Sequence, residues 1–377
     1  MAANTFPFAI EDIQEPNKIY DKKLVHVGPK RYLFPSGYRE LGPQYYNFKL
    51  RSDDIFIVGF PRSGTTWSQE MIWLLNNNLD YDRAKATVLS ERIPTIDLQL
   101  YGNIISLGEN TSLPQEVLKR FESPLNWLPN APSPRFIKSH LPLSLMPPGL
   151  LDTTKVVYVA RDPRDVVVSL YNILKIHLLK DIPFEEYWDA FCEGNIIRAP
   201  LFEHIKEGWA LRDHPNLFFM TYEEMSKDLP SIVRRMSTFF GKKYTEEQIR
   251  RLCEHLSFEK FKTNTAVNRD TTFSAAGITR EKLSFVRKDC TRELVQVGPK
   301  RYVFPGVYKE LASQYYNFEL RPDDIFLLGF PRSGTTRCQE AIWLLNNNLD
   351  YEKAQSAVID DRCPLLELCT WREIQGT

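Results

Sequence analysis

The segment from Gly59 to Thr66 (GFPRSGTT) carries the residue types of a phosphate-binding loop. Its two glycines have the spacing of G-x-x-x-x-G-K-[ST], the loop that cradles the phosphates of nucleoside triphosphates. Thr65 stands where the usual lysine would be, and the cation is instead Arg62. Backbone N–H groups and the positive end of a following helix would face a bound anion. The segment therefore predicts a phosphate site in which an arginine supplies the charge.

The residues on either side of this loop predict a strand before it and a helix after it. The apolar run Ile55–Val58 is typical of a short buried strand, and Trp67–Leu75 has helical spacing. An ordinary strand-to-helix turn, punctuated by proline and glycine, is the alternative interpretation. A kinase or ATPase is disfavoured, because in those enzymes the missing lysine bridges the terminal phosphates beside a metal.

Lys138 ends a second candidate strand, at 135–138, and His140 follows two residues later. Because they are two residues apart, an extended backbone would place both side chains on one face. A lone histidine is more often packed in a core or solvated at the surface than catalytic. The sharper hypothesis is that His140 is a general base.

Arg161 and Ser169 follow a third apolar run, at 156–160. An arginine near the start of a helix is a natural phosphate ligand. The alternative is simple helix capping, with Asp162 as the N-cap and Pro163 at the first helical position. Both interpretations can hold together.

Composition favours a soluble globular protein. The 377 residues include 48 basic and 48 acidic side chains, so no net charge attracts nucleic acid or an anionic membrane. The sequence shows no signal peptide and no run of the roughly 20 apolar residues that a membrane span needs. The six cysteines form no CxxC pair, and no cluster has metal-ligand spacing. We therefore expect a cytoplasmic protein with reduced thiols, no metal and no nucleic-acid or membrane partner.

Residues 25–81 recur at 295–351, with 43 of 57 positions identical. A single long and nearly verbatim copy is typical of a partial duplication rather than of a solenoid, whose repeats are short. We therefore expect one domain at 1–288, followed by a loosely packed duplicate of 19–107 at 289–377. Without a sheet to pack on, the duplicate could not bury its apolar faces.

Between the copies, apolar runs alternate with helical patterns. Strands are predicted at 135–138, 156–160 and 216–221, and helices at 165–176, 184–191, 202–211, 231–240 and 246–255. This alternation predicts an α/β fold with a doubly wound parallel sheet, whose chemistry gathers at the carboxyl ends of the strands.

Three ordered motifs resemble those of the cytosolic sulfotransferases, a family that uses 3′-phosphoadenosine 5′-phosphosulfate (PAPS). They are [YF]-P-[KR]-S-G-T-T-W at 60–67, K-[ST]-H-L-P at 138–142 and Y-x-x-R-[DN]-P-x-D at 158–165. The resemblance covers about 34–288, and it is strongest to the insect branch that includes retinol dehydratase. It implies a P-loop-like fold and transfer of a sulfuryl group from PAPS to a small lipophilic alcohol or phenol, without a metal.

The resemblance also implies a role for each matching residue. His140 would be the general base, with Lys138 and Arg62 at the sulfuryl group. The expected cofactor-binding residues are Arg62, Ser63, Gly64, Thr65 and Thr66 at the 5′-phosphosulfate, Trp67 stacked on adenine, Tyr222, Ser257 and Phe258 along the adenosine, and Arg161, Ser169, Arg287 and Lys288 toward the 3′-phosphate.

The last cofactor motif of the family, F-x-R-K-G-x-x-G-x-W, matches only over Phe285–Lys288. Asp289 replaces its first glycine, and the duplicated segment follows. A side chain at that position would block close approach of the backbone to a phosphate, and a carboxylate would repel it. We therefore expect weakened PAPS binding. The alternative function is a non-catalytic product of a fused or misassembled gene.

Overall fold

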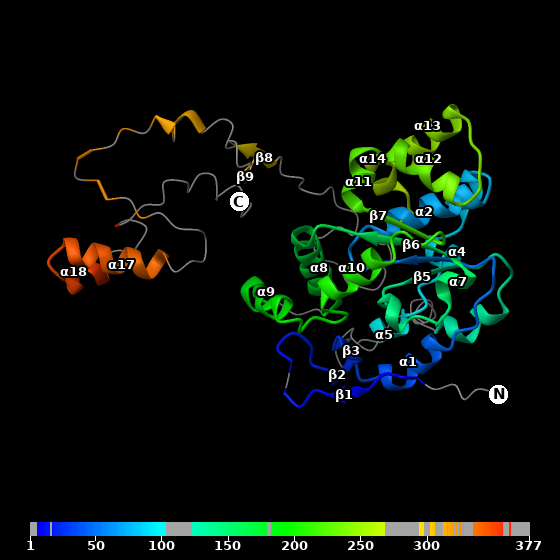
Figure 1. The fold of residues 1–377 in the computed structure, drawn as a ribbon, viewed down its shortest axis with the longest axis horizontal. Helices are drawn as coiled ribbons and strands as arrows, with labels where there is room; N and C mark the ends of the chain where they lie inside the picture. Colours follow the sequence, from blue (N-terminus) through cyan, green and yellow to red (C-terminus); the bar gives the residue numbers. More distant parts are fainter. Residues whose placement is uncertain are drawn as a thin grey trace. The chain divides into compact units, whose positions relative to one another are not determined.

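The chain divides into two compact units, Met1–Lys288 and Asp289–Thr377 (Figure 1). The computed structural model describes residues 6–15, 17–102, 123–178 and 182–267 of the first unit. In the second unit it describes 294–297, 302–305, 312–314, 316–317, 319, 321–322, 324–325, 327, 335–356 and 362. Among all these residues, no helix is both long and apolar enough to cross a membrane.

Four parallel strands form the centre of the first unit, in the spatial order β5-β4-β6-β7. They are β4 (Ile55–Val58), β5 (Phe136–Ser139), β6 (Lys155–Ala160) and β7 (Leu217–Thr221). The next strand in the chain after β4 lies on one side of it, and the strand after that lies on the other. The crevice at such a switch point is the usual ligand site of an open α/β sheet. The predicted α/β fold with a parallel sheet is confirmed.

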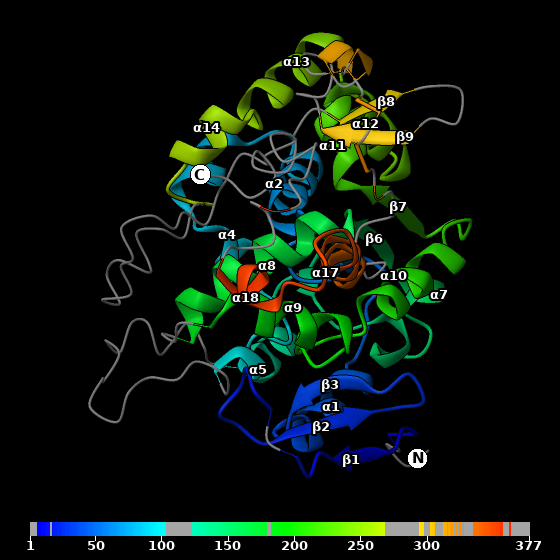
Figure 2. The same cartoon turned by 90° about the vertical axis from the view of Figure 1, so that its left-hand side faces the viewer.

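Alternate residues of β4 enter two different cores, because successive side chains of a strand point to opposite faces. Ile55 and Ile57 pack with α2 (Thr65–Asn76) and the helices near the end of the unit. Phe56 and Val58 pack in the other core, with the N-terminal strands. Figures 1 and 2 show these two layers above and below the sheet. With both faces covered, the strands consist mostly of apolar residues, as those of parallel sheets do.

Each of the six helices predicted from spacing is present, with both ends within two residues of the prediction. They are α2, α8 (Pro163–His177), α9 (Phe184–Cys192), α10 (Leu201–Ala210), α12 (Leu229–Phe239) and α13 (Glu246–His255). The Asp162 side chain caps α8 by accepting from the Arg164 N–H, and Pro163 occupies the first helical position.

The remaining described helical elements of this unit were not predicted. They are α1 (Tyr38–Tyr46), α3 (Tyr81–Ala86), α4 (Leu89–Arg92), α5 (Gln99–Gly102), α7 (Leu150–Thr153), α11 (Tyr222–Lys227), α14 (Phe258–Thr263) and the 3₁₀ turns η1 (Pro124–Asn126), η2 (Leu128–Asn130) and η3 (Leu143–Leu145).

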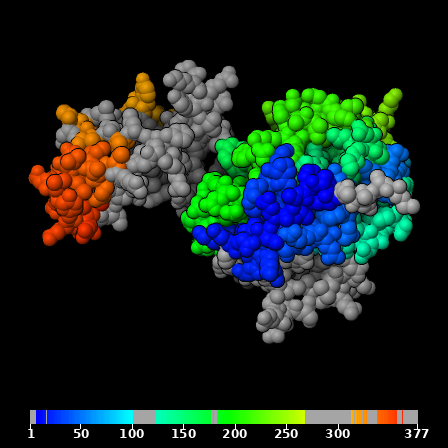
Figure 3. Space-filling model, turned by 60° about the horizontal axis from the view of Figure 1, so that its bottom comes forward, coloured from blue at the N-terminus to red at the C-terminus, as the bar shows by residue number. Residues whose placement is uncertain are grey.

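An antiparallel sheet near the N-terminus was also not predicted. It consists of β1 (Ile10–Asp12), β2 (Leu24–Val27) and β3 (Tyr32–Pro35), paired in that order. These three segments lie outside the alternation of apolar runs and helical patterns on which the prediction is based. In Figure 3 these blue residues lie against the green residues of α8 and α9, with which Leu24 and Leu33 share a core.

The second unit repeats the local structure of its counterpart at a constant offset of 270 residues. The hairpin β8 (Leu294–Val297) and β9 (Tyr302–Pro305) has the register of β2 and β3. The helices α17 (Thr335–Asn346) and α18 (Tyr351–Ser356) correspond to α2 and α3. Burial differs between the copies: Ile325 and Leu345 are 60% and 72% exposed, whereas Ile55 and Leu75 are 7% and 0% exposed. Local sequence thus reproduces local structure, whereas the burial of the equivalent described residues differs between the copies.

Candidate active site

The three strand ends singled out from the sequence meet at the switch point of the sheet. The loop from Gly59 to Gly64 follows β4, His140 follows β5, and Arg161 follows β6. Because β4 pairs with both β5 and β6, these three connections are neighbours. Strand pairing therefore brings together residues that are about eighty and one hundred positions apart in the chain.

The two loop glycines are required by close packing as well as by conformation. A Cβ at Gly59 would lie 2.4 Å from the backbone oxygen of Val159 on β6, closer than any real contact. Gly64, the residue before α2, has φ +93°, and a Cβ there would lie 2.6 Å from the ring of Tyr222. Only glycine lets the loop approach β6 and the Tyr222 ring this closely.

The loop has the features expected of an anion site. No side chain caps the N-terminus of α2, so the orphan N–H groups of its first turn are not satisfied by a cap. The Ser63 hydroxyl is buried and has no hydrogen-bond partner among the described residues. Buried polar groups are nearly always paired, so an unsatisfied one in a loop of this kind suits a bound ligand. The donor set, the bare helix end and the glycine cradle fit the phosphosulfate of PAPS.

Two arginines join the loop to α8. Nε of Arg62 donates to the Ser169 hydroxyl at 2.9 Å, and a guanidinium N–H of Arg161 donates to the Arg62 carbonyl at 2.9 Å. Arg161 also lies over the Tyr222 ring, 4.4 Å from its centroid. Burial lowers the pKa of Arg161, although the nearby Asp165 opposes this effect. These contacts bring the residues predicted for the two phosphate groups of the nucleotide into one network.

The residues predicted along the adenosine converge around Trp67. Its ring lies 5.6 Å from that of Tyr222, and its indole N–H donates to the carbonyl of Leu256 at 2.9 Å. Leu256 directly precedes Ser257 and Phe258, which begin α14. Thr65 is buried at the start of α2 beside half-buried Thr66. Arg287 and Lys288, the other two predicted residues, lie outside the described residues.

His140 is held as a neutral base. Its Nδ1 lies 2.5 Å from the carbonyl oxygen of Gly59. A carbonyl can only accept, so Nδ1 carries the hydrogen and the lone pair of the neutral ring is on Nε2. Burial, then the charges of Lys138 and Arg198, hold the pKa of His140 well below its ordinary 6.5. The ring is therefore ready to accept a proton across the neutral pH range.

Four buried residues around His140 carry chemistry that the sequence did not single out. Asp97 accepts from the His140 N–H, and Arg198 pairs with Asp97. Nε2 of His204 donates to the His140 carbonyl, and the Tyr158 hydroxyl lies 2.6 Å from Nδ1 of His204. Asp97 and Arg198 match no motif, and only the apolar surroundings of Arg198 in the sequence IIRAP hint at its burial.

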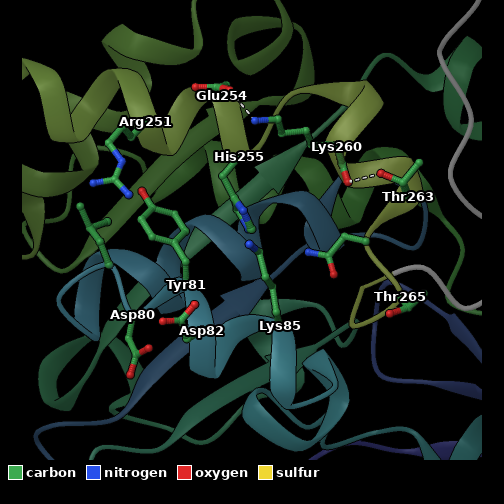
Figure 4. A pocket seen from close by; sticks show the side chains of 12 residues that line it. Asp80, Tyr81, Asp82, Lys85, Arg251, Glu254, His255, Lys260, Thr263 and Thr265 are labelled. Carbon is green, nitrogen blue, oxygen red and sulfur yellow. Dashed lines mark hydrogen bonds and ion pairs between the residues drawn. The ribbon is translucent and has the colours of Figure 1, made fainter.

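An open pocket of about 820 Å³ is lined by residues of α3, α13 and α14 (Figure 4). Tyr81, Lys85, Arg251 and His255 are among its lining residues, and none of the predicted site residues is. His255 contacts the buried Glu70 at 2.9 Å. The pocket therefore adds nothing to the chemistry at the strand ends.

Anion donors beside a neutral base equip a protein for group transfer to a hydroxyl, and no metal is indicated. Among the described residues, no group of three or more His, Cys, Asp or Glu side chains could hold a metal ion. Residues 52–293 and 322–375 match the sulfotransferase domain family, so the chain belongs to the sulfotransferases. The second matched range falls in the duplicated segment.

Individual relatives agree with this family. Over 251 residues, 65% of this chain, it is 34% identical to luciferin sulfotransferase of Photinus pyralis and spans 66% of that protein. It is 31% identical to sulfotransferase 1B1 of Mus musculus over 71% of this chain and 83% of the relative. Retinol dehydratase, solved with androsterone and inactive cofactor PAP, superposes with a TM-score of 0.69 at 35% identity, covering 86% of this chain and 99% of that one. A second structure of that protein contains retinol and PAP.

Proposed function

We propose that this protein is a PAPS-dependent sulfotransferase that moves a sulfuryl group to the hydroxyl of a small lipophilic alcohol or phenol. The observation that carries the proposal is the position of His140, a buried neutral base directly beside the glycine loop. Retinol and androsterone, which the retinol dehydratase structures contain, are lipophilic alcohols and support the acceptor class. We also propose a cytoplasmic location, in keeping with free thiols at Cys192 and Cys253.

The reaction needs few groups from the protein. PAPS supplies an activated sulfuryl group whose leaving oxygen gains negative charge during transfer. Arg62 and Lys138 would stabilise that charge, as positioned cations do in phosphoryl transfer. Nε2 of His140 would accept the proton that the acceptor hydroxyl loses as it attacks. Trp67 and Tyr222 would fix the nucleotide by contact with its base.

The junction after Lys288 determines how well the chain binds nucleotide, and it lies outside the described residues. We propose that Asp289 weakens the grip on the 3′-phosphate, since the family motif has a glycine there. We also propose that 289–377 is a partial duplicate that contributes nothing to the site. The intact glycine loop and the neutral His140 favour an enzyme over a non-catalytic product of a fused gene.

Binding of 3′-phosphoadenosine 5′-phosphate (PAP), measured by calorimetry, tests the nucleotide site. Gly64→Ala should weaken PAP binding by about ten- to one-hundred-fold, because overpacking against Tyr222 costs about 1–3 kcal/mol. Gly149→Ala is the matched control. Gly149 also precedes a helix with positive φ, +77°, but the nearest atom to its Cβ would be 3.9 Å away. Equal PAP affinity in the two variants, or none in the unaltered protein, would contradict the site.

The duplicate is predicted to contribute little to stability. Leu75 and Leu345 are equivalent residues of the two copies, buried in α2 and exposed in α17 respectively. Leu75→Ala should lower the free energy of unfolding by about 2–5 kcal/mol, whereas Leu345→Ala should change it by less than about 0.5 kcal/mol. Deleting 289–377 should shift the Tm of the first unit by less than about 3 °C. Comparable losses for both leucines would mean that the second copy is an integrated part of the fold.

A further inference from the structure

We propose that Asp97 and Arg198 are positioning residues for His140: Asp97 fixes its backbone, and Arg198 fixes Asp97 and sets the charge around the imidazole ring. The inference rests on the proposed role of His140 as the base. It adds two residues, distant from each other in the sequence, to the machinery of sulfuryl transfer.

The Asp97 side chain extends by one bond the hydrogen-bonding pattern between β5 and the segment before Asp97. The segment before it pairs with β5, since the Lys138 N–H donates to the Pro94 carbonyl at 2.9 Å and the Ile96 N–H donates to the Lys138 carbonyl at 2.8 Å. One residue beyond β5, the His140 N–H donates to Oδ1 of Asp97 at 3.1 Å. A carboxylate thus takes the place of the next backbone acceptor. Because Asp97 is fully buried, this bond is not exchanged with water.

Arg198 holds the other oxygen of the same carboxylate. Its guanidinium donates to Oδ2 of Asp97 at 2.5 Å from one terminal nitrogen and at 3.2 Å from Nε. Its backbone is held at φ +74°, with its N–H donating to the Leu33 carbonyl at 2.7 Å. A positive φ is unfavourable for a non-glycine residue and persists only where the surroundings hold it. Here the backbone bonds to Leu33 of the antiparallel N-terminal sheet hold this conformation, from which the buried guanidinium reaches Asp97.

Two positive charges oppose protonation of the His140 ring: Lys138 on β5, and Arg198 in the segment before α10. A third ionisable side chain, His204, comes from α10 itself. Asp97 is the buried carboxylate that balances Arg198. Burial lowers the pKa of His204 to about 4, so His204 adds no charge at neutral pH. Protonating His140 would add a further positive charge to a buried cluster, which is costly.

Neutralising Arg198 should therefore raise the pKa of His140. Removing one nearby like charge shifts a pKa by about one unit. Below the raised pKa the ring is protonated and cannot act as base, so kcat would fall about tenfold per pH unit on the acid side. Asp97→Asn keeps an oxygen to accept the His140 N–H but removes negative charge, so it should not raise this pKa.

The experiment follows the His140 ring proton by NMR over a pH series and, in parallel, the pH dependence of kcat. The variants of the full chain are Asp97→Asn, Arg198→Gln, Arg198→Lys and the double variant Asp97→Asn with Arg198→Gln. If Arg198→Gln alone fails to fold, the double variant takes its place. It removes both charges and therefore leaves no unpaired ion in the interior. Arg198→Lys keeps the positive charge and should leave the pKa of His140 near its original value.

We expect the pKa of His140 to rise by about one unit in Arg198→Gln and by less in the double variant, which also removes the Asp97 carboxylate, with the acid limb of kcat moving by the same amount as the pKa in each. An unchanged pKa in the NMR series would overturn the positioning proposal, even if kcat fell. A shifted pKa without a shifted kcat profile would leave the positioning intact and overturn instead the assignment of His140 as base. If the role of Arg198 were purely structural, its replacement would lower kcat by the same factor at every pH. The size of that fall would not depend on the charge of the side chain at position 198.

Discussion

Replacing His140 by alanine should lower the kcat of sulfuryl transfer by at least about a hundred-fold, because the acceptor hydroxyl would lose the group that takes its proton. The affinity for PAP should remain nearly unchanged, since His140 faces the acceptor side of the reaction. Turnover can be measured by the release of PAP, and affinity by calorimetry. Because burial keeps the pKa of His140 well below 6.5, the base form is populated at neutral pH and kcat should not fall between pH 8 and 6.5.

His214→Ala provides the matched control for this prediction. His214 lies near the start of β7, at the end of the strand opposite the loop, and its Nδ1 accepts from the Asn216 N–H at 3.1 Å. Its replacement should leave kcat unchanged. If His140→Ala turned over as fast as this control, another group would have to be the base.

Arg62→Ala should produce the second large effect, a fall in kcat of about 10²–10³ with a much smaller change in PAP affinity. Charge develops on the 5′ side only during transfer, so a cation at that position stabilises the transition state more than the bound nucleotide. The alanine retains the backbone geometry, because Arg62 already has φ +70° without being glycine. Arg62→Lys keeps the charge but not the planar donor geometry, and it should recover part of the rate.

Arg161→Ala separates binding from chemistry in the same network. Arg161 lies over Tyr222 on the nucleotide side, so its loss should raise the KM for PAPS about tenfold or more and change kcat less than Arg62→Ala does. If Arg161→Ala instead lowered only kcat, and Arg62→Ala raised only KM, the roles of the two arginines would be the reverse of those proposed.

The sequence by itself determined the local elements of the candidate site. The loop glycines, the four parallel strands and the six longer helices could be predicted because each depends on residues close together in the chain. Capping of α8 by Asp162 is of the same kind, since the side chain bonds a backbone N–H two residues away. The second copy shows that local sequence is enough for a local element. Its helix α17 spans the residues equivalent to those of α2, although Leu345 is exposed where Leu75 is buried.

Only the tertiary structure decided what surrounds His140. Asp97 is 43 residues before it, and Arg198 is 101 residues after Asp97. No periodicity or motif links these positions, because strand pairing at the sheet edge and the N-terminal sheet bring them together. The protonation state of His140 was likewise beyond the sequence. It follows from burial and from the sum of nearby charges, and both quantities exist only once distant segments have packed around the ring.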